Sequence, residues 1–147
     1  MNIAVVNLDS AMAQSAQGRE LMEQLTTFQR ETHDEISAST DQLKQLRQRI
    51  TESAHSLPAD QLKRLQQQFE EGREKLQQFQ KDKQLEGELL HQKGLEEIKL
   101  QLGPVLHNLR VENEYDVILN TETVLAMADW VDITKAVAVN LSQTRNF

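Results

Sequence analysis

The side chains best suited to acid–base or metal chemistry in this sequence are its four histidines. They are His33, His55, His91 and His107. None lies at a recognised metal-ligand spacing from another histidine or from a carboxylate, and each falls in a predicted helix or at its tip. Cysteine is absent, which excludes thiol nucleophiles, disulfides and cysteine metal sites. We therefore expect solvated helix positions rather than a metal or catalytic site.

A second group that could do chemistry is a set of carboxylates at helical spacing: Glu70, Glu71, Glu74 and Asp82. Basic residues are interleaved with them: Arg73, Lys75, Lys81 and Lys83. Mixed signs along a helix are typical of a solvated face, so we expect no catalytic dyad. The sequence also has no phosphate-binding glycine loop, no Gly-x-Ser-x-Gly and no His-Glu-x-x-His. These observations predict a protein that is not an enzyme and binds no cofactor.

The third group consists of cations near the middle of the chain: Lys44, Arg47, Arg49, Lys63 and Arg64. Residues 44–64 contain only two acids, so this segment carries a net charge of +3, whereas the whole chain carries −7. Two interpretations stay open: an ordinary solvated surface, or a capture point for acidic partners or for a membrane surface. The overall acidity argues against a nucleic-acid partner, which requires a basic footprint to displace phosphate counterions.

The composition indicates the kind of scaffold that positions these groups. Of 147 residues, 38% are hydrophobic, 27% are charged and only 4% are aromatic, with five glycines and two prolines. This is too little bulk for a thick core and too few helix breakers for a disordered chain. A long, thin helical structure with a narrow apolar seam fits best.

The sequence contains no membrane-spanning or signal-peptide pattern. No segment approaches the roughly 20 apolar residues needed to cross a bilayer. The first residues also lack the basic and apolar regions of a signal peptide. We expect either a cytosolic protein or an exported protein whose signal has been removed.

The apolar periodicity predicts a first long helix over residues 18–53. Its seam recurs at an average step of about 3.6 residues, the period of a straight helix. The seam positions are Leu21, Leu25, Phe28, Thr32, Ile36, Ser39, Leu43, Leu46 and Ile50. The polar members, Thr32 and Ser39, should weaken the contact locally.

A second helix is predicted over residues 58–112, after a break at Ser56–Asp60 that contains a proline suited to a first helical turn. Its seam begins with Leu62, Leu65, Phe69, Gly72, Leu76 and Phe79. This seam should degrade over Asp82–Gly94, where two glycines lower helix stability, and Pro104 should kink the helix further on. Two helices joined by a short turn must lie antiparallel if both seams are to be buried.

The strand signals lie at the two ends of the chain. Short apolar runs predict strands at 3–8, 115–119 and 123–127, with a hairpin-like turn at 120–122. Asp9 or Ser10 is expected to cap the helical turn that follows the first strand.

A closing amphipathic helix is predicted over residues 133–142, with Asp132 as its cap. Trp130, the only tryptophan, precedes this helix. It has two interpretations, either a residue of the core or of a subunit contact, or an aromatic residue that binds a partner.

Together these elements predict an α+β fold that is mostly α. A long antiparallel coiled-coil helical hairpin, residues 18–112 with its tip near 54–60, would project from a small β-containing body, which the family resemblance described below implies to be a trimerisation body. The body would comprise residues 1–17 and 113–147. Three short strands make a poor isolated sheet and would leave apolar runs exposed in a monomer, so we expect an obligate oligomer.

Five features follow one another in a distinctive order along nearly the whole chain: Ile3–Ser10, the glutamine-rich hairpin, Pro104, Tyr115–Leu119 and Val131–Thr134. In this order and spacing the chain resembles the Skp/OmpH family of periplasmic chaperones. The most specific parts of the resemblance are the Asp-Ile-Thr triplet before the last helix and the paired end strands.

The resemblance implies a homotrimer whose strands join in a central body and whose three hairpins enclose a cavity. The cavity would hold unfolded outer-membrane β-barrel proteins, so the implied function is that of an ATP-independent holdase without a cofactor. The implied location is the periplasm, after removal of a signal peptide. The cations at the hairpin tip are the candidate contacts with these clients or with a peripheral membrane surface.

Two other functions are compatible with a helical hairpin. The main alternative to a holdase is a coiled-coil scaffold or tether that binds one folded partner. It predicts one stoichiometric ligand and no general suppression of aggregation. A cytosolic chaperone of the prefoldin type fits less well, because its subunits place both chain ends at the coiled-coil tips and their strands in mid-chain.

Overall fold

The computed structural model describes residues 1–144, so the final residues of the predicted body, 145–147, lie outside the described part of the chain. The chain divides into two compact units. Unit 1 comprises Met1–Leu25 and the chain from Leu90 onward, and unit 2 comprises Thr26–Leu89. The boundary between these two units falls inside the long helices.

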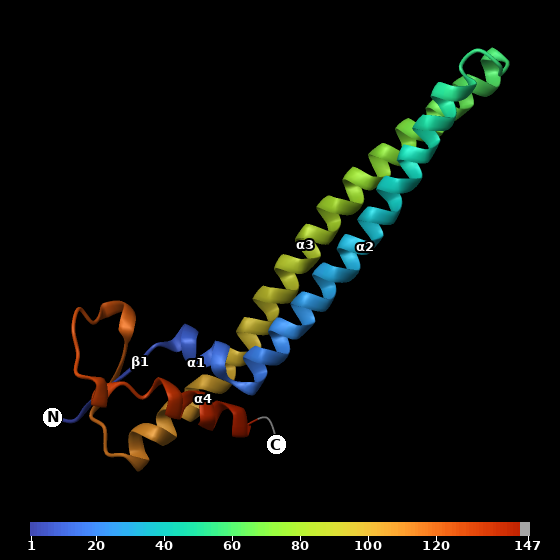
Figure 1. The fold of residues 1–147 in the computed structure, drawn as a ribbon. Helices are drawn as coiled ribbons and strands as arrows, with labels where there is room; N and C mark the ends of the chain where they lie inside the picture. Colours follow the sequence, from blue (N-terminus) through green and yellow to red (C-terminus); the bar gives the residue numbers. More distant parts are fainter. Residues whose placement is uncertain (145–147) are drawn as a thin grey trace. The chain divides into compact units, whose positions relative to one another are not determined.

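Two long helices form where the apolar periodicity predicts them. Helix α2 spans Ala16–Ser53 and α3 spans Ala59–Glu112, joined by residues 54–58. Within unit 2 the two helices lie side by side (Figure 1), with their predicted seam positions half-buried and most other positions exposed. The helices thus bury a narrow stripe rather than a thick core. No helix within residues 1–144 is long and apolar enough to cross a membrane.

The α3 seam continues through Asp82–Gly94, so the prediction that it degrades there is wrong. The half-buried positions include Lys83, Gly87, Leu90 and Gly94. The Lys83 ammonium lies 5.5 Å from the ring centroids of both Phe28 and Phe79, a cation–π arrangement that accommodates a lysine in an apolar stripe. The glycines admit large side chains from α2, so this seam changes composition without ending.

The two strands found within residues 1–144 pair in parallel in unit 1. Strand β1 (Ile3–Val6) lies beside β2 (Val117–Asn120), with Ile3 opposite Val117. The β-branched residues of both segments favour strand conformation, and the last three residues of β1 are buried. The predicted strands at 3–8 and 115–119 are therefore present, with shifted ends.

Strand β1 stops at Val6 because the next residue starts a helix. Asn7 is the N-cap of α1 (Leu8–Gln14), and its side chain accepts a hydrogen bond from the Ser10 backbone N–H at 3.0 Å. An asparagine oxygen satisfies one of the free N–H groups of the first turn in this way. The cap is thus Asn7, and the expectation of Asp9 or Ser10 is wrong.

The predicted strand over 123–127 and the hairpin turn before it do not form. Thr121–Thr123 instead form a 3-10 helix, η1, in which Val124 N–H donates to Thr121 O at 3.1 Å. Residues 124–128 have no regular secondary structure, and a second 3-10 helix, η2, covers Asp129–Val131.

The use of the two edges of β1 helps to explain why residues 123–127 form no strand. One edge of β1 pairs with β2. The other edge is occupied further along the chain, because Ile133 N–H donates to Val5 O at 2.8 Å and Val5 forms a bridge with Asp132. Residues 123–127 therefore have no partner on β1. They do not fold back onto the open edge of β2 either, because η1 stands where the hairpin turn was predicted, although their apolar composition suits a strand.

The closing helix, α4, spans Thr134–Gln143, close to its predicted bounds. The N-cap of α4 is Ile133, which makes no side-chain cap bond, so the expectation of Asp132 as the cap is wrong by one residue. The Asp132 carboxylate still accepts hydrogen bonds from both the backbone N–H and the hydroxyl of Thr134. The Thr134 hydroxyl oxygen also accepts a hydrogen bond from Asn7 N–H at 3.0 Å. The start of α4 is therefore tied to the end of β1.

One apolar cluster holds unit 1 together and draws on every helix of the unit. Its buried members are Val6, Ala11, Met12, Leu21, Ile98, Leu102, Val105, Leu109, Val137 and Leu141. Helix α3 continues through Pro104, and Leu102 and Val105 on either side of it are buried. The ends of α2 and α3 share this core with β1 and α4, which explains their place in unit 1.

Gly94 provides a test of how closely α2 and α3 pack within unit 1. A Cβ at Gly94 would lie 2.4 Å from Leu21 Cδ1 and 2.9 Å from Leu21 Cδ2. Gly94→Ala should lower the free energy of unfolding by about 1–3 kcal/mol, because overpacking against a buried leucine outweighs the roughly 1 kcal/mol of helix propensity that alanine gains. Urea denaturation at a fixed protomer concentration measures this change.

Leu21→Ala supplies the control, because it removes the atoms that the new Cβ would meet. This substitution alone should cost about 2–5 kcal/mol. In that background Gly94→Ala should instead raise the free energy of unfolding by up to about 1 kcal/mol. An equal cost of Gly94→Ala in both backgrounds would contradict this account of the packing.

Candidate functional site

The predicted cations occupy the turns that flank the connection between α2 and α3, at one end of unit 2 (Figure 1). They are Lys44, Arg47 and Arg49 in the last turns of α2, and Lys63 and Arg64 in the second turn of α3. All five side chains are exposed. We call these five residues the tip cations.

The tip cations form no ion pair within residues 1–144. The salt bridges of that part of the chain join Arg73 to Glu70 and Lys83 to Glu86. Of the two acids near the connection, Glu52 accepts a hydrogen bond from Gln48 at 2.9 Å, and Asp60 lies in the first turn of α3. The positive N-terminal end of α3 offsets the Asp60 charge. The tip cations are therefore free to attract an anionic partner.

The histidines and carboxylates that could perform acid–base chemistry are not brought together. His33, His55, His91 and His107 are all exposed. Within residues 1–144 no group of three or more histidines and acids could hold a metal ion. Glu70 lies 4.0 Å from Arg73, and Asp82 accepts a hydrogen bond from Gln78 at 2.8 Å, each within the same helix. These contacts are those of a solvated helix face.

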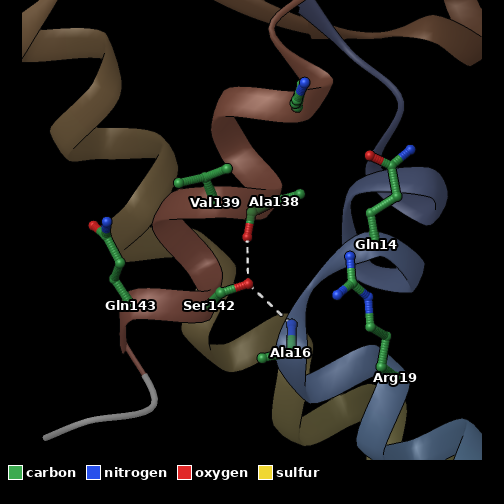
Figure 2. A pocket seen from close by; sticks show the side chains of 8 residues that line it. Gln14, Ala16, Arg19, Ala138, Val139, Ser142 and Gln143 are labelled. Carbon is green, nitrogen blue, oxygen red and sulfur yellow. Dashed lines mark hydrogen bonds between the residues drawn. The ribbon is translucent and has the colours of Figure 1, made fainter.

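Figure 2 shows a hollow in unit 1 between the start of α2 and α4. The Ser142 hydroxyl bridges the two helices: its oxygen accepts a hydrogen bond from Ala16 N–H at 2.9 Å, and its O–H donates one to Ala138 O at 2.8 Å. Two exposed cations, Arg19 and Lys135, lie at this hollow, and its lining contains neither histidine nor carboxylate. The hollow therefore lies at a structural contact between two helices, and its lining lacks the histidine and carboxylate side chains of a catalytic site.

A group of exposed apolar residues in unit 1 lies on the segment that follows η1. Leu125 is fully exposed, Trp130 is 81% exposed and Met127 is 41% exposed. All three lie within residues 124–131, which we call the exposed segment. Large exposed apolar side chains close together in sequence make this segment a candidate surface for contact with another molecule.

The exposure of Trp130 excludes a place in the core of the single chain. A subunit contact or a partner contact remains. Leu125 and Met127 were missed as exposed residues, because the sequence assigned them to a strand of the body. Within residues 1–144 strand β2 pairs with β1 alone, so its other edge carries backbone groups that can pair with another chain.

Comparison with known proteins places this chain in a family context. Residues 2–141 match a family model described as outer membrane protein (OmpH-like). No curated protein matches the chain. The crystal structure of a proposed outer membrane chaperone (OmpH-like) from Caulobacter crescentus aligns with a TM-score of 0.91 at 19% sequence identity. The alignment covers 97% of this chain and 85% of that chain, and at this identity it shows a common fold.

Proposed function

The chain belongs to the OmpH-like family of outer membrane proteins, and on this basis we propose that it is an ATP-independent holdase chaperone. Its clients are unfolded outer-membrane β-barrel proteins, which it keeps soluble in the periplasm. The observation that carries the proposal is the family match over residues 2–141, which includes residues of both units. The tip cations and the exposed segment supply the surfaces on which such a function can rest.

Holding an unfolded chain requires many weak contacts rather than one reactive group. The narrow seam between α2 and α3 leaves most of their side chains exposed, and many of these are glutamines and charged residues. Such a surface stays soluble while it contacts a client at many points. In our proposal the α2–α3 pairs of several chains form the walls of a cavity, so that enclosure and multivalent contact act together.

The assembly that would create this cavity is proposed to be a homotrimer formed through unit 1. Leu125, Met127 and Trp130 supply apolar surface, and the free edge of β2 supplies unpaired backbone groups. Contact with other copies of the chain would bury the three apolar side chains and the unpaired backbone groups of β2 away from water. Trp130 is then a subunit-contact residue in the assembled protein.

The proposed assembly predicts a mass of about three times 16.9 kDa by light scattering coupled to size exclusion. Leu125→Glu should shift the protein to the mass of a single chain, because the contact would bury an unpaired carboxylate. Leu85→Glu, at an exposed leucine of α3 in unit 2, is the matched control and should leave the trimer intact. A wild-type protein that is monomeric and fully folded at micromolar concentration would refute the proposal.

A variant in which α2 and α3 are both shortened tests the proposed cavity directly. Deleting Gln45–Gln68 and joining the ends through a short glycine-containing loop shortens α2 and α3 together. Unit 1 should remain folded and assembled, because its apolar cluster contains no residue of this segment. Suppression of the aggregation of an unfolded β-barrel protein should fall by at least about tenfold, since enclosure and multivalency depend on arm length.

The deletion has two informative outcomes beyond the expected one. A shortened trimer that suppresses aggregation as well as the full-length protein would place the activity in unit 1 and overturn the cavity mechanism. A full-length protein that binds one folded ligand stoichiometrically and suppresses no aggregation would instead favour the scaffold or tether.

The charge of the tip is tested separately at full arm length. Replacing Arg47, Arg49, Lys63 and Arg64 by glutamine should slow client capture by about tenfold at low salt, because electrostatic steering raises association rates. At about 1 M salt the variant and the wild type should capture clients at similar rates, since exposed charges are then screened within about 3 Å. Stopped-flow fluorescence with a labelled client measures both rates.

The same variant tests the proposed contact with a membrane surface. Wild-type protein should sediment with vesicles that contain anionic lipid, and the variant should sediment less. Vesicles of neutral lipid serve as the control. Equal capture rates at every salt concentration, with equal vesicle binding, would reduce the tip cations to an ordinary solvated surface.

A further inference from the structure

Two glycines of α3 lie beneath large side chains of α2 within unit 2. A Cβ at Gly72 would lie 2.8 Å from Leu43 Cδ2, and a Cβ at Gly87 would lie 3.0 Å from Phe28 Cε1. Contacts of this length are shorter than ordinary van der Waals separation. Each glycine therefore acts as a notch that receives one large residue of the opposite helix.

An apolar seam alone does not fix the alignment of two helices. Its pattern repeats about every seven residues, so a slide of α2 along α3 by seven residues again places seam against seam. The connecting residues 54–58 can absorb such a slide by gaining or losing helical turns. Some further feature must select one alignment.

The spacing of the notches removes this ambiguity. Leu43 and Phe28 are fifteen residues apart, and so are Gly72 and Gly87, and fifteen is not a multiple of seven. A slide of seven residues in one direction places Phe28 opposite another glycine, Gly94, but puts Leu43 opposite Phe79. In the other direction Leu43 meets Leu65 and Phe28 meets Gln80. Both large residues meet a glycine in the observed alignment, and no whole-heptad slide preserves both contacts.

Lys83 adds a second constraint at the same place. Its ammonium lies 5.5 Å from the Phe28 and Phe79 ring centroids and 3.2 Å from Glu86 Oε2. A half-buried cation in an apolar seam is tolerated where such partners surround it. A slide of seven residues would carry the Phe28 ring two turns away and leave Lys83 facing other seam residues. A single lysine at a seam position is known to specify the alignment of coiled coils.

We propose that Gly72, Gly87 and Lys83 together form a register lock that permits one alignment of α2 with α3. The lock sets the length of the connection at residues 54–58. It also fixes which cations of α2 lie across from Lys63 and Arg64. This inference concerns the folding of unit 2 and does not depend on the proposed chaperone function.

Engineered cysteines report the alignment, because the chain has none of its own. Ser39→Cys with Leu76→Cys reports the observed alignment, since both positions line one hollow between α2 and α3. Ser39→Cys with Phe69→Cys reports a slide of seven residues. After mild oxidation, the fraction of chains with an internal disulfide is read from the monomer-sized band on a denaturing gel.

The parent protein should form the first disulfide at least about ten times more than the second. The unlocked variant carries Phe28→Ala, Leu43→Ala, Gly72→Ala, Gly87→Ala and Lys83→Leu. Alanine favours helix, so both helices should persist, and the two disulfides should form within about threefold of each other. An unlocked variant that keeps the parent ratio overturns the lock. Loss of both disulfides with helical circular dichroism retained would mean that the observed alignment is lost in favour of one that neither pair reports, which agrees with the lock.

An exchange variant controls for the possibility that the unlocked variant changes its disulfides only because its helices pack poorly. Leu43→Gly with Gly72→Leu, and Phe28→Gly with Gly87→Phe, moves each notch to the opposite helix while each pair keeps its combined volume. Lys83 is unchanged. The exchange variant should retain the parent ratio of disulfides, and a ratio as low as that of the unlocked variant would overturn the proposal.

Discussion

The parallel pairing of β1 with β2 is the constraint on which unit 1 depends. Parallel neighbours require a connection that returns to the starting end of the sheet, and here the connection contains α1, α2 and α3. Asn2 secures the meeting point: its N–H donates to Asp116 Oδ2 at 2.6 Å, and its side-chain amide donates to Asn113 O and Glu114 O at 3.3 Å. Glu114 adopts a positive φ of 56° just after α3 ends, which turns the chain toward β2.

The exposed apolar surface follows from how the edges of this small sheet are used. β1 is flanked by β2 on one side and by Asp132–Ile133 on the other, so it offers no further edge. The intervening residues 124–131 must leave the sheet and return, and they carry Leu125, Met127 and Trp130 with them. An apolar segment that is excluded from its own sheet offers surface for the contact between copies that we propose.

The helices could be predicted from the sequence because their signal is local and repeated. Leu25 to Ile50 recur at the helical period, and each is half-buried where expected. The 123–127 strand could not be judged in this way, because its composition suits a strand. Its exclusion depends on the 3-10 helix that replaces the hairpin turn and on Ile133, a residue distant in sequence that pairs with Val5. The packing role of the glycine notches could not be predicted for a related reason. In the sequence a glycine indicates a weak point of a helix, and its packing role becomes clear only when the facing residue, such as Phe28 at Gly87, is known. The tip cations were placed correctly at the connection, but their role remains a prediction.

The buried core and most of the exposed surface of the long helices therefore come from different parts of this chain. The apolar cluster of unit 1 draws only on residues before Leu25 and after Leu90, and the packing of unit 2 requires only a narrow stripe of half-buried residues. Nearly all remaining side chains of α2 and α3 are left to solvent. Because these side chains contribute little to the core, they can be selected for solubility and for weak contact with many partners. A protein that holds unfolded chains needs this freedom more than a pocket, since an unfolded client presents no fixed shape for a pocket to match.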